Sequence, residues 1–250
     1  MPSFRSDIVD IAYEVSGEGP PVLLIHGFAS NARVNWIDTG WVKSLNEVGY
    51  QTITFDNRGH GESGKLYDPA GYPAPEMAED ARRLVDHLGL PKVRVMGYSM
   101  GARIAAFLTL NHPERVIAAV LSGLAENMIR GVGGAEPIAR ALEAPSADSV
   151  TDPSARTFRV FAEQTKGDLK ALAACMRASR QKITLAELGQ IHVPVLVVAG
   201  EMDEIAGKVD PLVAAIPGAR GVTLARRNHM NAVGDRQHKE VVISFLNSIN

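Results

Sequence analysis

Cysteine is nearly absent from the chain, which has only Cys175 among its 250 residues. A single thiol excludes an internal disulfide and fits a reducing compartment. Cys175 lies in an alanine-rich stretch of helical character. We therefore expect a buried structural thiol at this position and not a nucleophile.

Long apolar runs and an excess of one charge are also missing. No stretch approaches the roughly 20 apolar residues that cross a bilayer, and residues 1–10 lack the apolar core of a signal peptide. The net charge of −2 and the pI near 6.4 leave no basic surface for nucleic acid or anionic lipid. We therefore expect a cytoplasmic protein with a small-molecule substrate and no nucleic-acid or membrane partner. Its oligomeric state, monomer or homodimer, is left open by the sequence.

Short apolar runs alternate with helical patterns along the chain. We expect strands over 22–25, 52–55, 93–96, 116–121, 195–199 and 222–225, and helices over 76–88, 102–111 and 235–249. This alternation predicts an α/β fold in which a mostly parallel central sheet is covered by helices on both faces. In such sheets, binding residues gather in the loops at the carboxyl ends of the strands.

Residues 125–188 interrupt the alternation because they carry no strand signal. Gly131, Gly133 and Gly134 are followed by helical stretches rich in Ala, Arg and Glu. A structureless loop of this length is unusual in a compact domain. We expect a small helical cap inserted at about 125–188 into a single domain that covers residues 1–250.

The segment Gly97-Tyr98-Ser99-Met100-Gly101 stands between a predicted strand and an apolar helical stretch. This pattern and context are typical of a nucleophile elbow, a strained turn that exposes a serine hydroxyl. Residues without side chains are needed two positions before and after the serine, because a larger group would strike the neighbouring strand and helix. The turn also places a helix N-terminus near a developing oxyanion. Ser99 is therefore the expected nucleophile.

Four further blocks occur in a characteristic order. They are His26-Gly27-Phe28, the segment from Asp56 to Ser63, residues 193–203, and Asn228-His229 ahead of an amphipathic terminal helix. Together with the elbow they cover nearly the whole chain, and in them the sequence resembles the α/β-hydrolase superfamily. The resemblance implies that superfamily's fold and serine chemistry, and it leaves the substrate unspecified. No metal-binding motif is present and no cofactor is implied.

A serine hydroxyl needs a base to take its proton as it attacks. Four of the seven histidines lie in or beside predicted helices or at the far edge of the sheet: His87, His112, His192 and His238. His26 and His60 lie at the correct edge, but the resemblance assigns them structural roles, and neither follows the order serine, acid, histidine. His229 is the expected base.

The acid that orients the base is expected to be Asp203, three residues beyond Gly200 at the end of a buried strand. In some relatives the acid follows the preceding strand, which makes Glu126 the alternative here. Asp56 and Arg58 are also charged and lie near the edge of the sheet where the site is expected. Their tight, glycine-containing turn favours a structural role in tying loops together.

The resemblance implies an oxyanion hole formed by the backbone N–H groups of Phe28 and Met100. Phe28, Trp36, Tyr98 and Met128 are the expected walls of the substrate pocket, although each is equally compatible with core packing. No signal in the sequence separates these two roles for an apolar side chain.

These features predict a serine hydrolase that cleaves a small-molecule carboxylic ester or lactone through an acyl-Ser99 intermediate. The same triad leaves open a C–C bond hydrolase and a cofactor-free perhydrolase or haloperoxidase, and the same fold leaves open a non-enzymatic ligand receptor. Dinucleotide binding is disfavoured, because the turn lacks G-x-G-x-x-G and the bulky Tyr98 and Met100 stand where a pyrophosphate would approach the backbone.

Overall fold

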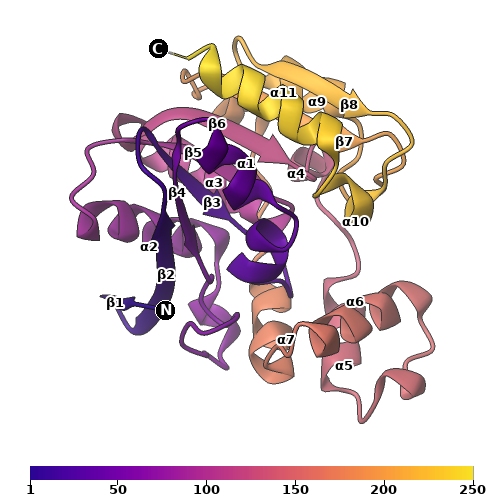
Figure 1. The fold of residues 1–250 in the computed structure, drawn as a ribbon. Helices are drawn as coiled ribbons and strands as arrows, with labels where there is room; N and C mark the ends of the chain where they lie inside the picture. The colour runs from indigo at the N-terminus through magenta and orange to yellow at the C-terminus, as the bar shows by residue number, and fades with distance from the viewer. Residues whose placement is uncertain (250) are drawn as a thin grey trace.

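An eight-stranded sheet forms the centre of the molecule in the computed structural model, which describes residues 1–249 (Figure 1). The strands lie in the order β1-β2-β4-β3-β5-β6-β7-β8. Their bounds are Ser3–Ser6 (β1), Val9–Ser16 (β2), Pro21–Ile25 (β3), Gln51–Phe55 (β4), Val93–Tyr98 (β5), Val116–Ser122 (β6), Val195–Gly200 (β7) and Arg220–Leu224 (β8). From β4 to β8 all neighbours are parallel, which confirms the predicted α/β class.

All six predicted strands are present, and two strands that we did not predict, β1 and β2, precede them. β2 pairs antiparallel with β4, with Tyr13 opposite Phe55, and β1 pairs antiparallel with β2. β1 alternates between exposed and buried residues, and β2 mixes buried residues with exposed ones. They lack the continuous apolar runs of the central strands because one of their faces meets solvent.

Helices cover both faces of the sheet, and alternate residues of each strand point to opposite layers. In β3, Leu23 and Ile25 face the layer that contains α2 (Ala74–His87), α3 (Met100–Asn111) and α9 (Val209–Ala215). Val22 and Leu24 face the layer of α1 (Trp41–Glu47) and α11 (Arg236–Asn247), which lie side by side (Figure 1). The three predicted helices correspond to α2, α3 and α11.

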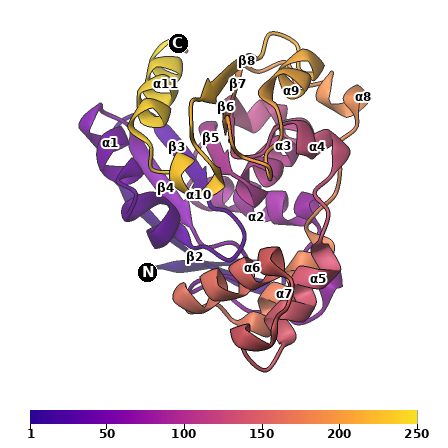
Figure 2. The ribbon, with the colours of Figure 1, turned by 90° about the vertical axis from the view of Figure 1, so that its right-hand side faces the viewer.

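Between β6 and β7 the chain forms five α-helices, one short 3-10 helix (Ala147–Ser149) and no strand. The α-helices are α4 (Glu126–Arg130), α5 (Ala135–Glu143), α6 (Pro153–Gln164), α7 (Leu169–Ala178) and α8 (Leu185–Leu188). Residues of α5, α6 and α7 bury an apolar cluster of their own, in which Leu142 and Leu172 are almost fully covered. These three helices lie together at one end of the molecule, away from α11 (Figure 2).

The site lies where β5, β7 and β8 end, at the carboxyl edge of the parallel strands. The last short helix, α10 (His229–Ala232), begins in the loop that follows β8. Among residues 1–249, no helix combines the length and the apolar character needed to cross a membrane.

Candidate active site

Ser99 occupies a strained turn between β5 and α3. Its φ of 56° lies in the left-handed region, which residues other than glycine seldom adopt. A Cβ atom at Gly97 would lie 2.1 Å from the backbone oxygen of Gly101, and one at Gly101 would lie 1.9 Å from that of Ile25. Both glycines are therefore required by backbone contacts, which is the steric reason expected from the sequence.

The three residues predicted as nucleophile, acid and base lie together. His229 Nε2 is 3.0 Å from Ser99 Oγ. Nδ1 of the same ring is 3.0 Å and 2.9 Å from the two carboxylate oxygens of Asp203. These distances are those of hydrogen bonds, so one imidazole ring bridges a hydroxyl and a carboxylate.

Asp203 is held in place independently of the histidine. Its side chain is fully buried, and Oδ1 accepts hydrogen bonds from the backbone N–H groups of Ile205 and Ala206 at 3.1 Å and 2.9 Å. Glu126, the alternative acid, instead forms an ion pair of 2.8 Å with Arg130 and accepts the backbone N–H of Lys208. Of the two acids that the sequence left open, only Asp203 contacts His229.

The loop that carries His229 is fixed by its neighbours. Asn228 caps α10 by accepting hydrogen bonds from the backbone N–H groups of Met230 and Asn231. The Tyr98 hydroxyl donates a hydrogen bond of 2.6 Å to the His229 backbone oxygen. Burial, aided by the negative charge of Asp203, raises the pKa of Tyr98 well above its usual value, so the hydroxyl keeps the proton that it donates.

The two predicted oxyanion donors, Phe28 and Met100, both border Ser99. Within residues 1–249, neither of their backbone N–H groups donates to a protein acceptor. The loop that carries Phe28 is braced from behind, because the backbone N–H of Gly27 donates to Asn35 Oδ1 at 3.0 Å and that of Ala32 donates to Asp56 Oδ1 at 2.7 Å. The backbone N–H groups of Gly27 and Ala32 thus hold the loop, and the N–H of Phe28 is not needed for this purpose.

A cavity of about 380 Å³ opens in front of Ser99 and His229. Its walls are mainly apolar, and no Asp, Glu, Lys or Arg of the described chain lines it. The predicted residues Phe28 and Tyr98 are among its walls, together with Phe158 and Phe161 from α6. This cavity suits an uncharged, largely apolar group.

Two predicted pocket residues lie elsewhere. Trp36 is fully buried and packs edge-on against Trp41, and Met128 is fully buried in the core cluster that includes residues of α3. Neither borders the Ser99 cavity. The aromatic walls Phe158 and Phe161 were missed, although aromatic residues three positions apart on a helix with many polar residues are a signal of one covered face.

The remaining polar groups near the edge of the sheet bind other parts of the chain. His26 Nε2 accepts the backbone N–H of Asn57 at 2.9 Å, and Arg58 forms a buried ion pair with Asp80 at 2.6 Å. Burial lowers the pKa of His60 to about 3, so this ring is uncharged at neutral pH. None of these side chains forms a hydrogen bond to Ser99 or His229 within the described chain.

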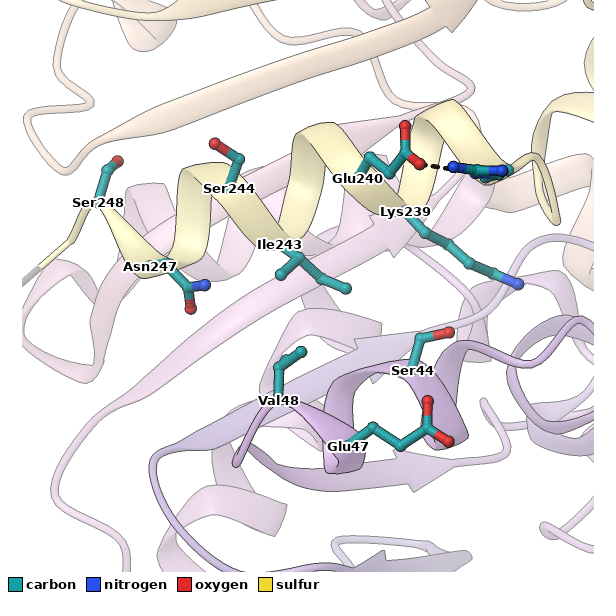
Figure 3. A pocket seen from close by; sticks show the side chains of 10 residues that line it. Ser44, Glu47, Val48, Lys239, Glu240, Ile243, Ser244, Asn247 and Ser248 are labelled. Carbon is teal, nitrogen blue, oxygen red and sulfur yellow. Dashed lines mark hydrogen bonds and ion pairs between the residues drawn. The ribbon is translucent and has the colours of Figure 1, made fainter.

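A larger hollow, of about 800 Å³, lies between α1 and α11 on the outer surface (Figure 3). Ser44 and Lys239 are among its residues, and none of them borders the Ser99 cavity. No histidine lines this hollow to activate its serines. Across residues 1–249, no group of three His, Cys, Asp or Glu side chains is arranged to hold a metal.

The chain is similar to known proteins over nearly its whole length. A model of the alpha/beta hydrolase fold family matches residues 20–155. The non-heme chloroperoxidase CPO-A1 of Kitasatospora aureofaciens is 35% identical over 46% of the chain and 40% of its own length. The chain spans about two fifths of the length of several such curated relatives.

Two solved structures match nearly the whole chain. A hydrolase from Pseudomonas aeruginosa PA01 is 26% identical with a TM-score of 0.82, and the match covers 98% of this chain and 97% of that one. Est816, an N-acyl homoserine lactone degrading enzyme, is 26% identical with a TM-score of 0.77 and coverage of 98% and 100%. The chain belongs to the alpha/beta hydrolase fold family.

Proposed function

We propose that the protein is a serine hydrolase that cleaves a small-molecule carboxylic ester or lactone through an acyl-Ser99 intermediate. The observation that carries this proposal is the His229 ring, which lies within hydrogen-bond distance of Ser99 on one side and of Asp203 on the other. With Nδ1–H donating to Asp203, the lone pair of Nε2 faces the serine hydroxyl. That tautomer is the one a general base requires.

In the proposed reaction, Ser99 Oγ attacks the carbonyl carbon while His229 Nε2 takes the hydroxyl proton. The negative charge that develops on the carbonyl oxygen is stabilised by the backbone N–H groups of Phe28 and Met100. His229 then gives its proton to the leaving alkoxide as the acyl-enzyme forms. In the second half, His229 takes a proton from water, the hydroxide attacks the acyl carbon, and Ser99 is released with its proton restored.

The apolar cavity and the relatives support ester or lactone substrates. Its walls offer no charged side chain to an acyl or alcohol group, and the match to a lactone-degrading enzyme extends over nearly the full chain. The similarity to a chloroperoxidase supports a second candidate, in which hydrogen peroxide takes the place of water and releases a peracid from the same acyl-enzyme.

Hydrolysis of p-nitrophenyl esters of increasing acyl length, together with a set of lactones, tests the proposal. The wild type is compared with Ser99→Ala and with Ser244→Ala, which removes an exposed hydroxyl on α11. We expect turnover in the wild type and in Ser244→Ala and a loss of turnover in Ser99→Ala. Undiminished hydrolysis by folded Ser99→Ala contradicts the proposal, whereas a wild type that a fluorophosphonate labels but that turns over no substrate favours a receptor.

A further inference from the structure

Ser99 also borders a second, much smaller compartment, of about 40 Å³. Phe28, Phe158 and Ile205 contribute to both compartments, so the two adjoin at the nucleophile. The small compartment differs from the large one in its charge, because Arg103 and Arg180 line it. A substrate at Ser99 therefore meets an apolar space and a cationic space at once.

Arg103 is a buried cation without an acidic partner. The residue lies on α3, is only 2% exposed, and donates from Nη1 to the backbone oxygen of Gln181. Within residues 1–249 no carboxylate forms an ion pair with it. Burial, followed by the positive charge of Arg180, lowers the pKa of Arg103 to about 10. At neutral pH the guanidinium keeps its charge, with most of its five donors uncommitted.

Arg180, like Arg103, is a cation without an acidic partner among the described residues. It follows α7, is partly buried, and donates from Nη1 to the backbone oxygens of Val132, at 3.1 Å, and Gly133. Burial lowers the pKa of Arg180 as well. No Asp or Glu of the described chain forms an ion pair with it.

Two other buried arginines of this protein are paired with acids, whereas a third, Arg94, lies over the Tyr50 ring and donates to the backbone oxygen of Ile249. Arg58 contacts Asp80 at 2.6 Å, and Arg159 contacts Glu163 at 2.7 Å. Burying a charge is costly unless a counter-charge is present, and two like charges close together add to that cost. The cationic compartment therefore brings two arginines without acidic partners together, and it lies beside the nucleophile.

We propose that Arg103 and Arg180 bind a carboxylate of the substrate, so that Ser99 acts preferentially on an ester or lactone that carries a carboxylate on one side and an apolar group on the other. This inference rests on the proposed function. A guanidinium matches the planar, two-oxygen geometry of a carboxylate. The small volume admits such a head group, while the uncharged cavity receives the apolar part.

The backbone contacts of the two arginines offer a different explanation. Arg103 binds Gln181, and Arg180 binds Val132 and Gly133; on this explanation both serve only to hold the ends of the helical segment against α3. If Arg103 and Arg180 have only this structural role, the enzyme has no preference for anionic substrates. This explanation predicts that removing either guanidinium lowers stability and affects charged and neutral substrates alike.

The test compares pairs of esters of equal shape and different charge. Mono-p-nitrophenyl esters of adipic, pimelic and suberic acids carry the carboxylate on the acyl side, and acetates of hydroxybenzoic acids carry it on the alcohol side. The corresponding terminal amides are the neutral partners. The measured quantity is the ratio of kcat/KM for the acid to kcat/KM for the amide.

We expect this ratio to exceed unity by about 10- to 100-fold in the wild type for one of the two series, as for a charge-assisted pair. Arg180→Gln should lower the ratio by about 10-fold or more, and Arg180→Lys should restore part of it. Arg156→Gln, which removes an exposed arginine of α6 paired with Asp148, is the matched control and should leave the ratio unchanged. Arg180 is the preferred site for substitution because Arg103 is more deeply buried.

A binding measurement separates this inference from the proposed function. Calorimetric titration of Ser99→Ala with adipate and with adipamide requires no turnover. Adipate should bind more tightly than adipamide, and Arg180→Gln in the same background should abolish the difference. Equal binding of the two, together with a ratio near unity while Ser99 still hydrolyses neutral esters, overturns the inference and leaves the proposed function standing. Preferential adipate binding without Ser99-dependent hydrolysis would support carboxylate binding by the arginines and contradict the proposed function.

Discussion

The hydroxyl of Tyr98 donates a hydrogen bond of 2.6 Å to the backbone oxygen of His229. Tyr98 is the residue directly before Ser99, so one side chain joins the turn of the nucleophile to the loop of the base. The two rings also lie against each other, with centroids 5.4 Å apart. The distance between Ser99 Oγ and His229 Nε2 is therefore fixed by packing as well as by Asp203.

Tyr98→Phe keeps the ring and removes only this hydrogen bond. We expect the free energy of unfolding to fall by about 1 kcal/mol and kcat to fall several-fold with KM little changed, because His229 is less well positioned. Urea denaturation and steady-state kinetics with a p-nitrophenyl ester measure the two effects. A loss of stability with unchanged kcat would show that Tyr98 does not position the base.

Asp203→Asn should lower kcat by about 1,000- to 10,000-fold, because a neutral amide neither holds the required tautomer nor stabilises the imidazolium. Glu126→Gln is the matched control, since Glu126 pairs with Arg130 and does not contact His229. Kinetics of the two variants on one substrate decide between the acids. A large loss in Glu126→Gln with nearly full activity in Asp203→Asn would assign the role to Glu126.

Gly101→Ala should destabilise the fold by about 3 kcal/mol or more, because its Cβ atom would lie 1.9 Å from the backbone oxygen of Ile25. Gly133→Ala is the control, because a Cβ atom there meets nothing within 4 Å. Its stability should stay within about 1 kcal/mol of the wild type. Chemical denaturation of both variants measures the difference, and equal stabilities would contradict the packing described at the elbow.

The stability of the protein should fall as the pH decreases below 6.5. Burial lowers the pKa of His238 from 6.5 to about 4, and that of His60 to about 3. Each histidine therefore binds its proton first in the unfolded chain as the pH falls, so protonation favours unfolding between pH 6.5 and the folded pKa. Each contributes a loss of about 1.4 kcal/mol per pH unit within that window.

His238→Gln isolates one of these contributions. The variant loses the contact of 2.9 Å with Ser122 and is expected to be less stable at neutral pH. The slope of the unfolding free energy against pH between 6 and 4.5 should decrease by about 1.4 kcal/mol per pH unit, which corresponds to the binding of one proton. Denaturation curves across this range measure the slope, and an unchanged slope would mean that His238 is not the group responsible.

The sequence predicted the central strands because continuous apolar runs mark strands buried on both faces, and it missed β1 and β2 because their exposed face interrupts such runs. Ser99, Asp203 and His229 were assigned from their motifs and from the rule that parallel strands end at one edge of the sheet. A motif is a local signal and the edge rule is a topological one, so both can be read from the sequence without knowledge of side-chain packing.

The walls of the cavities could not be predicted in the same way. Trp36 and Met128 are apolar residues that we predicted as pocket walls, yet packing places them in the core. Phe158, which we did not predict, lines the cavity from α6. Arg103 and Arg180 come from different helical regions and meet only in the folded chain. Such positions depend on how the helices after β6 pack against the sheet, which no motif encodes.

Acylation of Ser99 is measured most directly as the mass of the protein during turnover of p-nitrophenyl acetate, quenched in acid and followed by peptide mapping. We expect the wild type to gain the mass of one acetyl group on the peptide containing Ser99 and Asp203→Asn to accumulate it more slowly. Ser99→Ala should gain none. Turnover without an acetylated Ser99, or with the acetyl group on another residue, would show that Ser99 is not the nucleophile.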